Sequence, residues 1–407
     1  MKKLLLCSAA VVGVAFSAAP AAAQIDVTIG GHTKNYIGWA DQDDRRASVA
    51  EANPAEARSF DMLRESELHV NAEGVADNGL TYGFHVEIEA DAGDDANTIE
   101  ESYLYLSSNL GRVNLGSEDG ANYLLQVAAP SADANIDGIR QYVQPVNYGA
   151  AAQARVRAAA DANANGIDDA DDTAIATVTT LTAGGIDYEN AVTGVDEKVT
   201  YLSPVWNGFQ FGGSYTPDVA NNALEDINSA NGLAGFSTDN VEDNLDDAWE
   251  AAVRYEGQFN NIGFAVGAGY TDVGIEADRA GNTHDDIQQW NVGLDLNIGA
   301  FGLGGVWTET DNVAGLRNVE SETYVLGADY TTGPFQLGLS YLNNDTDFAA
   351  VGSNVDTDRY TGGVIYTAAP GLSFRGSISH VEHDFSTATN VSDIDATSVL
   401  GGIQLNF

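Results

Sequence analysis

Hydrophobic and polar residues alternate along most of the chain. Between Tyr324 and Tyr330, tyrosine, leucine, alanine and tyrosine fall on one side of an extended backbone, and a glycine and an aspartate fall on the other. The same alternation runs through Phe335–Tyr341 and Trp249–Tyr255. A period of two residues over segments of this length predicts β-strands with one apolar and one polar face.

Aromatic residues recur in pairs six positions apart, which places both members of a pair on the same face of a strand. Such a pair spans about 20 Å along a strand, or about 15 Å of height once the strand tilts by roughly 40°. This is typical of two aromatic girdles that border a lipid-facing band. A soluble sandwich also favours aromatic residues in strands, but it does not explain the repeated spacing. The pairs are Phe209/Tyr215, Trp249/Tyr255, Phe264/Tyr270, Phe301/Trp307, Tyr324/Tyr330, Phe335/Tyr341 and Tyr360/Tyr366.

The connections between these strands alternate between short turns and long polar loops. Asn109–Gly111 and Thr332–Pro334 are short turns, whereas residues 217–246 and 343–355 form long loops. This predicts an all-β fold, a transmembrane antiparallel up-and-down β-barrel of about sixteen strands with both termini at the end that carries the short turns. The third long loop, residues 117–195, has too few large apolar residues to form a domain of its own, so we expect one barrel domain over residues 24–407.

The first 23 residues have the composition of a secretory signal peptide. Lys2 and Lys3 precede an apolar stretch that ends in an alanine-rich segment, and we expect cleavage after Ala23. Cys7 raises the alternative of a lipoprotein, but Leu6 stands where a small residue would be needed. Cys7 is the only cysteine, so the exported chain has no disulfide framework.

The chain is strongly acidic, with a formal net charge of −43 that becomes −45 when the two leader lysines are removed. This charge argues against nucleic-acid binding. It is compatible with a solvated secreted protein, or with a barrel that has acidic loops and an acidic lumen. The 44 glycines and 8 prolines favour strands and tight turns over helices.

Four segments and the end of the chain carry a resemblance to a known family. The segments are Asp77–Gly83 (DNGLTYG), Gly111–Gly120 (GRVNLGSEDG), Lys198–Pro204 (KVTYLSP) and Gly208–Pro217 (GFQFGGSYTP). Together they resemble the Gram-negative general diffusion porins, over most of the chain except residues 142–187. The resemblance implies homotrimers of sixteen-stranded barrels in the outer membrane, surrounded by lipid and lipopolysaccharide, that serve as pores for passive diffusion of small hydrophilic solutes and ions.

The last strand alternates and ends in an aromatic residue, Phe407. This resembles the signal that the outer-membrane barrel assembly machinery reads. We therefore predict that Phe407 is needed for assembly.

The resemblance also implies that the third long loop folds into the lumen and narrows it, with charged residues facing one another across the constriction. The acidic candidates on the loop are Glu118, Asp119, Asp133 and Asp137. Alternate side chains of a strand point to opposite faces, and the basic residues that fall on the faces away from lipid are the candidates for the basic wall. They are Lys34, His69, His85, Arg112 and Arg375. The same faces carry Glu67, Glu87 and Glu89, and a lumen lined with carboxylates attracts cations, so we expect a cation preference.

One motif in the long loop has the spacing of a calcium site. Asp161, Asn163, Asn165, Asp169 and Asp172 offer oxygen ligands, and Gly166 permits a sharp bend. The motif resembles a thrombospondin type 3 calcium repeat, although it occurs once and has Asn at two usual Asp positions. An acidic loop that binds no metal is the alternative. No cofactor is required by the predicted function.

Three rival functions remain open from the sequence. A substrate-specific channel would carry a ladder of aromatic or arginine residues in the lumen, and a barrel hydrolase would need Ser and His on adjacent lipid-facing strands. A secreted adhesive β-protein is the third. His380 and His383 suggest a metal site, but in a regular strand they point to opposite faces. We expect no enzymatic activity.

Overall fold

The computed structural model describes residues 25–42, 58–90, 99–131, 136–137, 140–141, 185–219, 244–276, 284–348, 353–386 and 393–407. The predicted leader, most of the long loop with its calcium motif, and Asp133 lie outside the described residues, as does the side chain of Asp137. Among the described residues, no helix has the length and apolarity that a membrane crossing needs.

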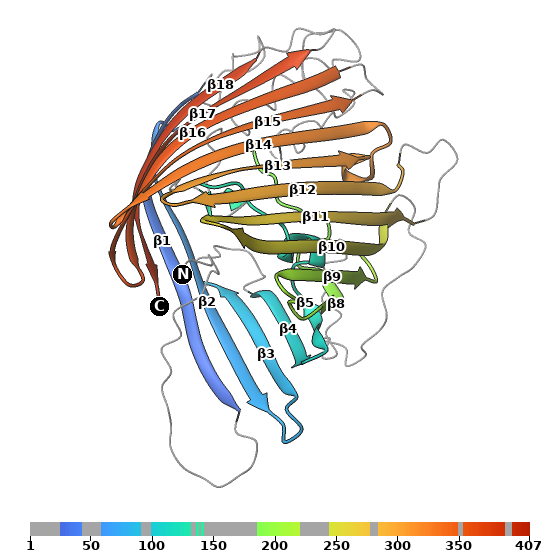
Figure 1. Cartoon of the computed structure of the whole chain (residues 1–407). Helices are drawn as coiled ribbons and strands as arrows, with labels where there is room; N and C mark the ends of the chain where they lie inside the picture. Colours follow the sequence, from blue (N-terminus) through green and yellow to red (C-terminus); the bar gives the residue numbers. More distant parts are fainter. Residues whose placement is uncertain are drawn as a thin grey trace.

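Sixteen antiparallel strands close into a single barrel, which confirms the predicted fold and strand number (Figure 1). The first and last strands, β1 and β18, are hydrogen-bonded neighbours, and this pairing closes the ring. The barrel strands are β1 (Asp26–Gln42), β2 (Phe60–Val75), β3 (Thr81–Glu89), β4 (Ile99–Ser108), β5 (Gly111–Ser117), β8 (Glu197–Leu202), β9 (Phe209–Thr216), β10 (Leu245–Phe259), β11 (Ile262–Ile275), β12 (Ile287–Ile298), β13 (Phe301–Asp311), β14 (Val319–Thr332), β15 (Phe335–Phe348), β16 (Ser353–Ala369), β17 (Leu372–Ser386) and β18 (Ile394–Asn406).

Short elements interrupt two of the connections. The loop between β5 and β8 contains the helix α1 (Ala121–Leu124) and a small ladder of β6 (Ile136–Asp137) with β7 (Arg140–Gln141). A 3-10 turn, η1 (Val313–Gly315), lies between β13 and β14. The loop from β5 to β8 is therefore the only connection between adjacent barrel strands in which the described part contains further strands.

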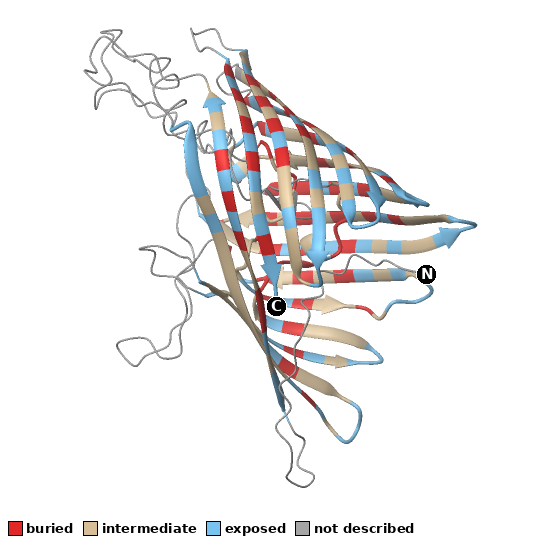
Figure 2. Cartoon of the chain, turned by 90° about the vertical axis from the view of Figure 1, so that its left-hand side faces the viewer, coloured by how far each residue is buried: buried red, intermediate tan, exposed pale blue. Residues whose placement is uncertain are grey.

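The alternation in the sequence becomes an alternation of burial along each strand (Figure 2). In β11 and β12, for example, buried residues alternate with more exposed ones, because successive side chains point into and out of the barrel. The outward positions carry exposed large apolar residues such as Leu326, Leu339 and Ile378. The barrel thus presents an apolar outer surface and a polar interior.

The paired aromatic residues form two bands on the outer surface, as predicted. In one band, Tyr215 and Trp249 have ring centroids 4.4 Å apart, and Tyr270 and Trp290 have centroids 4.3 Å apart. In the other band, closer to the short turns, Phe301 contacts Tyr330 and Phe335 contacts Tyr366 at 4.8 and 4.9 Å. Rings from different strands meet at the same height because the strands pair in a register that aligns them.

Candidate functional site: the inner wall and the third long loop

Polar side chains make up much of the inner wall of the barrel, and apolar side chains such as Val325 and Leu342 line it where the third long loop packs. Its buried positions include Thr200, Ser214, Thr271, Asn291 and Thr323, each from a different strand. A surface of hydroxyl and amide groups favours water over lipid, because these groups keep hydrogen-bond partners only in water or in a polar contact. The interior therefore suits an aqueous lumen.

The first part of the third long loop, residues 118–131, runs across the inner wall. It crosses β9 and then β11 to β14 at positions where these strands carry glycine. A Cβ atom at Gly269 would lie 1.8 Å from Oδ1 of Asn122, and one at Gly327 would lie 2.2 Å from the carbonyl oxygen of Pro130. The other glycines of this track are Gly212, Gly267, Gly293 and Gly304. The missing side chains let the loop lie directly against the strands.

Hydrogen bonds from the wall hold the outgoing part of the loop. Ser214 Oγ accepts from the backbone N–H of Ala121 at 2.8 Å, and Glu250 Oε2 accepts from that of Asn122 at 2.9 Å. The Asn122 side chain donates to Thr271 at 2.8 Å and accepts from Asn291. Farther along, Arg254 and Gln336 donate to the carbonyls of Gln126 and Ser131 at 2.8 and 3.2 Å. The loop is thus fixed at several points over its first fourteen residues.

The last described part of the loop, residues 185–196, returns along the same interior. The carbonyl of Ile186 accepts from Arg359 at 2.5 Å, and Ile186 packs against Val381 and Ile394. Tyr188 packs with Ala129 in an apolar cluster on the wall, and its hydroxyl accepts from the Ala129 N–H at 3.1 Å. Full burial raises the pKa of the Tyr188 hydroxyl, although the bond from Ala129 lowers it. The outgoing and returning arms therefore contact each other.

Glu250 of β10 ties the two arms to the wall together. Besides the bond to Asn122, its Oε1 accepts from the hydroxyl of Thr193 at 2.6 Å, on the returning arm. Gly120 lies against this carboxylate, since a Cβ atom there would be 2.0 Å from Oε2. Glu250 is 5% exposed. No local pattern in the sequence marks Glu250 for this role, because its contacts join residues more than fifty positions apart.

Two acidic candidates, Glu118 and Asp119, lie at the start of the loop and are buried. Asn114 donates to Glu118 Oε2 at 2.7 Å, and the Asp119 N–H donates to Glu101 at 3.2 Å. Burial raises the pKa of the Glu118 carboxyl, and the bond from Asn114 lowers it. Lys198 donates to three loop carbonyls, those of Glu118 (2.5 Å), Gly194 (2.8 Å) and Asp196 (2.8 Å). These groups anchor the base of the loop.

The five basic candidates face inward from β17, β1, β2, β3 and β5. These strands lie within a run of seven adjacent strands, from β17 through β18 and β1 to β5. Lys34 is fully buried and its Nζ lies 2.9 Å from Glu65. Arg112 lies over the ring of Tyr105, with 4.0 Å between guanidinium carbon and centroid, and donates to Asn114 at 2.6 Å. Arg375 lies near the short turns and donates to Ser373 at 3.4 Å. These three do not cluster.

His69 and His85 are brought together, with ring centroids 5.9 Å apart. His32 of β1 joins them at 6.0 Å from His69. The alternation along each strand predicts that His69 and His85 face inward, and it also puts His32 on the inward face, two residues before Lys34. The contact of His32 with His69 depends on the register of β1 and β2, which the sequence pattern does not supply. In the strand order, this histidine row on β1–β3 lies half way around the ring from β10–β12, where the loop is anchored.

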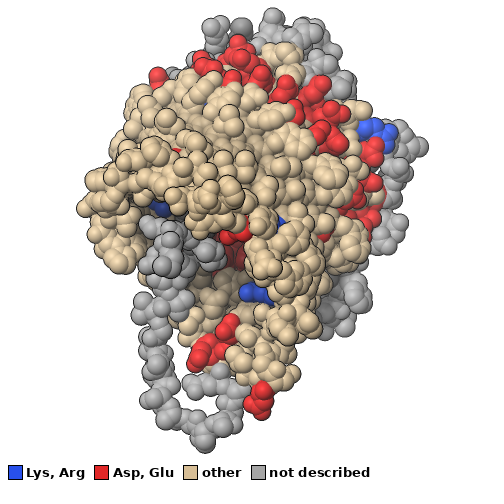
Figure 3. All heavy atoms as spheres, in the orientation of Figure 1, with Lys and Arg blue, Asp and Glu red and all other residues tan. Residues whose placement is uncertain are grey.

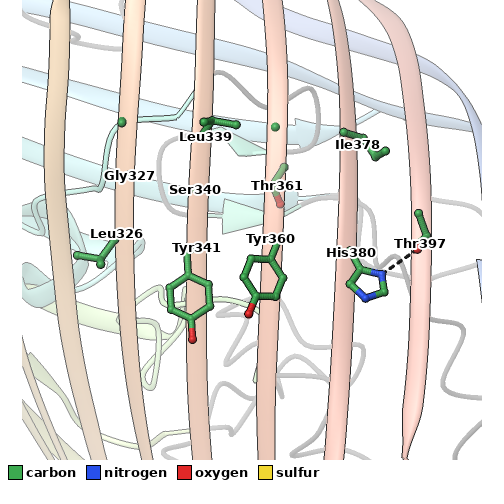
Figure 4. Close-up of a pocket in the computed structure, with 12 residues that line it drawn as sticks. Leu326, Gly327, Leu339, Ser340, Tyr341, Tyr360, Thr361, Ile378, His380 and Thr397 are labelled. Carbon is green, nitrogen blue, oxygen red and sulfur yellow. Dashed lines mark hydrogen bonds between the residues drawn. The ribbon is translucent and has the colours of Figure 1, made fainter.

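The sequence pattern also singles out Phe407 and the two histidines of β17. Phe407 lies on the outer surface with 43% of its area exposed, and its backbone exchanges hydrogen bonds with Gly31 at 3.0 and 3.1 Å. His380 and His383 do point to opposite faces, as predicted: His383 is fully buried inside. Figure 4 shows His380 outside, in a row with Tyr341 and Tyr360, bonded to Thr397. Its cross-strand neighbours are Tyr360 and Thr397, so neither is the serine that a hydrolase would need.

Comparison with known proteins gives the family and the fold. A family model described as Gram-negative porin matches residues 8–386. Uncharacterized proteins of Rickettsia conorii and Rickettsia prowazekii are 26% and 25% identical over 290 and 298 residues, 66% of this chain. The chain spans only 59% and 60% of the length of these two relatives.

Three solved structures share the fold. An anion-selective porin from Comamonas acidovorans is 17% identical, with a TM-score of 0.56 over 94% of this chain and 100% of that one. Salmonella typhi OmpF, solved with daunomycin, is 14% identical with a TM-score of 0.57 (94% and 98% covered). OmpT of Vibrio cholerae in a trimer form is 12% identical with a TM-score of 0.54 (94% and 99% covered).

Proposed function

The chain belongs to the Gram-negative porin family, and on this premise we propose that it forms a water-filled pore through which small hydrophilic solutes and ions diffuse passively, cations in preference to anions. Family and barrel together make it an integral protein of the outer membrane. The observation that carries the proposal is the loop of residues 118–131 lying on a polar inner wall, because such a loop narrows a lumen without closing it.

The cation preference rests on how the positive groups of the interior are used. Lys34 is buried beside Glu65, and Lys198 is buried among loop carbonyls. Arg359 is buried and holds the carbonyl of Ile186, and Arg254 pairs with Glu256 at 2.8 Å. These four cations stabilise the loop or neutralise a carboxylate next to them, whereas the inward Arg112 and Arg375 bond to the neutral side chains of Asn114 and Ser373. The inward carboxylates Glu67, Glu87 and Glu89 outnumber these two arginines. The remaining acidic side chains then set the sign of the field that a passing ion meets.

Acidic groups are also prominent at the surface of the molecule. Figure 3 shows Asp and Glu gathered along part of the rim and, together with some Lys and Arg, in the central hollow, next to a wide face that carries almost none. The uncharged face suits lipid, and the acidic rim suits cations. The Comamonas porin is anion-selective by name, so the shared fold does not fix the sign of selectivity. The charge on the inner surface decides whether cations or anions pass preferentially.

Reversal potentials across a planar bilayer test the proposal. In a KCl gradient at low salt, the wild type should prefer K⁺. The preference should weaken as salt rises, since the Debye length falls from about 30 Å at 0.01 M to about 3 Å at 1 M. Conductance should rise with salt without saturating. An anion preference would contradict the charge argument, and a conductance that one solute blocks would indicate a substrate-specific channel instead.

We propose a homotrimer as the assembled state. Membership of the Gram-negative porin family supports it, as does the trimer form in which OmpT of Vibrio cholerae, which shares the fold, was solved. Light scattering of the purified protein in mild detergent should give the mass of three chains, and the mass of one chain would refute it.

A further inference from the structure

Three histidines stand in a row on the inner wall, one from each of the first three strands. His32, His69 and His85 lie on β1, β2 and β3, and neighbouring rings are 6.0 and 5.9 Å apart and nearly perpendicular. They belong to strands that pair directly, so the row is fixed by the sheet and not by a loop. Neither the diffusion pore nor the anchoring of the loop requires such a row.

Two carboxylates lie between the histidines. Oε2 of Glu67 is 2.9 Å from Nε2 of His69 and 3.7 Å from Nδ1 of His32. Oε1 of Glu87 is 3.4 Å from Nδ1 of His69 and 2.8 Å from Nε2 of His85. The row therefore contains two triads that share His69, and in each triad the three ligand atoms lie within 4.8 Å of one another.

Neighbouring groups orient the outer two histidines toward these carboxylates. Asn71 Oδ1 lies 2.6 Å from Nδ1 of His85, which leaves Nε2 facing Glu87. Glu65 Oε1 lies 2.5 Å from Nε2 of His32, which leaves Nδ1 facing Glu67. A partner on the far nitrogen is the usual support of a metal-binding histidine, because it fixes the tautomer and the ring orientation.

We propose that this row binds one divalent transition-metal ion of the Zn²⁺, Cu²⁺ or Ni²⁺ class at His69. Two imidazoles and one carboxylate are a ligand set that these ions favour, whereas Mg²⁺ and Ca²⁺ require mostly oxygen ligands. Small side-chain rotations bring ligand atoms that are now within 4.8 Å to the spacing around one ion, and water completes a tetrahedral shell. A neutral imidazole has one free nitrogen, so the ion occupies one triad at a time.

The ligands are reachable from the lumen. Their side chains keep 11–20% of their area exposed, whereas Lys34 beside them is fully covered. An ion bound here would lie on the wall that faces the anchored loop across the ring, and it would add two positive charges at that level of the lumen. It would therefore reduce the flow of cations and narrow the path.

Calorimetry of the purified barrel in detergent tests the site without any transport. ZnCl₂ is titrated in excess Mg²⁺ and Ca²⁺, so that sites for hard cations are already filled. We expect one Zn²⁺ per chain, and at least about tenfold weaker binding for His69→Ala and His69→Gln, since even an outer-shell partner of a metal ligand contributes 10–100-fold. Two variants keep the test usable if one fails to fold, and heat-modifiable migration reports folding.

His380→Ala is the matched control. His380 also lies beside a glutamate, with Nε2 3.0 Å from Glu382, but it is on the outer surface and no second histidine joins it there (Figure 4). Zn²⁺ affinity should be unchanged in this variant. Loss of affinity in either His32→Ala or His85→Ala assigns the ion to the corresponding triad. Unchanged affinity in both of them, or in the His69 variants, overturns the proposal, as does an equal loss in His380→Ala.

A bilayer recording adds the consequence for flow, and this part alone rests on the proposed function. Micromolar Zn²⁺ should lower the wild-type conductance, chelator should restore it, and His380→Ala should respond as the wild type does. A folded barrel that binds Zn²⁺ but conducts nothing would refute the pore and keep the metal site. A conducting barrel whose His69 variants bind Zn²⁺ like the wild type would refute the metal site and keep the pore.

Discussion

Removing the Glu250 carboxylate should release the third long loop from the inner wall. This one side chain accepts hydrogen bonds from Asn122 on the outgoing arm and from Thr193 on the returning arm, at 2.9 and 2.6 Å. A hydrogen bond to a charged group contributes about 1.5–3 kcal/mol, so Glu250→Ala should remove about 3–6 kcal/mol of local anchoring. Each 1.4 kcal/mol is a factor of ten, so the detached population of the loop should rise at least about 100-fold.

Thiol labelling measures that population directly. The chain has one cysteine, Cys7, which lies in the predicted leader, so a cysteine placed at Ala121 would be the only thiol of the mature barrel. Ala121 is fully buried between loop and wall, and a reagent reaches it only when the loop lifts. Labelling then follows the open population, as exchange and proteolysis do for other local openings. We expect Ala121→Cys to react at least about 100 times faster in the Glu250→Ala background.

Glu256→Ala is the control for charge. Glu256 lies on the same strand and face as Glu250, pairs with Arg254 and makes no hydrogen bond to the described part of the loop. Glu256→Ala therefore removes a carboxylate but keeps the bond from Arg254 to the Gln126 carbonyl. If Ala121→Cys reacts equally fast with and without Glu250, or if Glu256→Ala accelerates labelling as much, the anchoring argument is wrong. Open-channel noise in bilayer recordings should rise along with the labelling rate.

Three further predictions concern other parts of the chain. Deleting Phe407 should leave unfolded protein in the periplasm, because the outward aromatic end of β18 is lost; normal levels of heat-modifiable barrel would refute this. Gly327→Val should lower single-channel conductance, because a side chain there meets the Pro130 carbonyl and pushes the loop into the lumen, and an unchanged conductance would contradict the packing. Ca²⁺, more than Mg²⁺, should protect the long loop from proteases, and Asp161→Ala with Asp169→Ala should abolish the protection; identical cleavage in chelator would leave no calcium site.

The barrel was predictable because its information is local. Alternation fixes which residues face lipid, and the six-residue spacing of Tyr324 and Tyr330 fixes the height of both girdles, each within one strand. Connection lengths then order the strands, since neighbours along the chain pair in space. None of these inferences depends on which residues contact each other across the lumen.

The path of the loop was not predictable for the same reason. Asn122 and Glu250 are 128 positions apart, and nothing in either neighbourhood marks them as partners. Gly269, Gly293 and Gly327 each read as weak points in a strand, and they become a track for the loop only when their strands are set side by side. The local sequence pattern predicts the barrel wall, but contacts between distant residues determine where the third long loop lies on it.

The Glu250 anchor and the histidine row lie on different, non-adjacent strands, and this separation predicts that their effects are independent. Glu250 lies on β10, whereas His69 lies on β2, six strands away around the barrel, and no described contact joins these two side chains. Changes at distant sites without shared partners usually add within about 0.5 kcal/mol. Zn²⁺ affinity in Glu250→Ala should therefore match the wild type, and Ala121→Cys labelling should not depend on His69. Coupling between them would mean that release of the loop from Glu250 changes the surroundings of the histidine row, and the two groups would then not be independent.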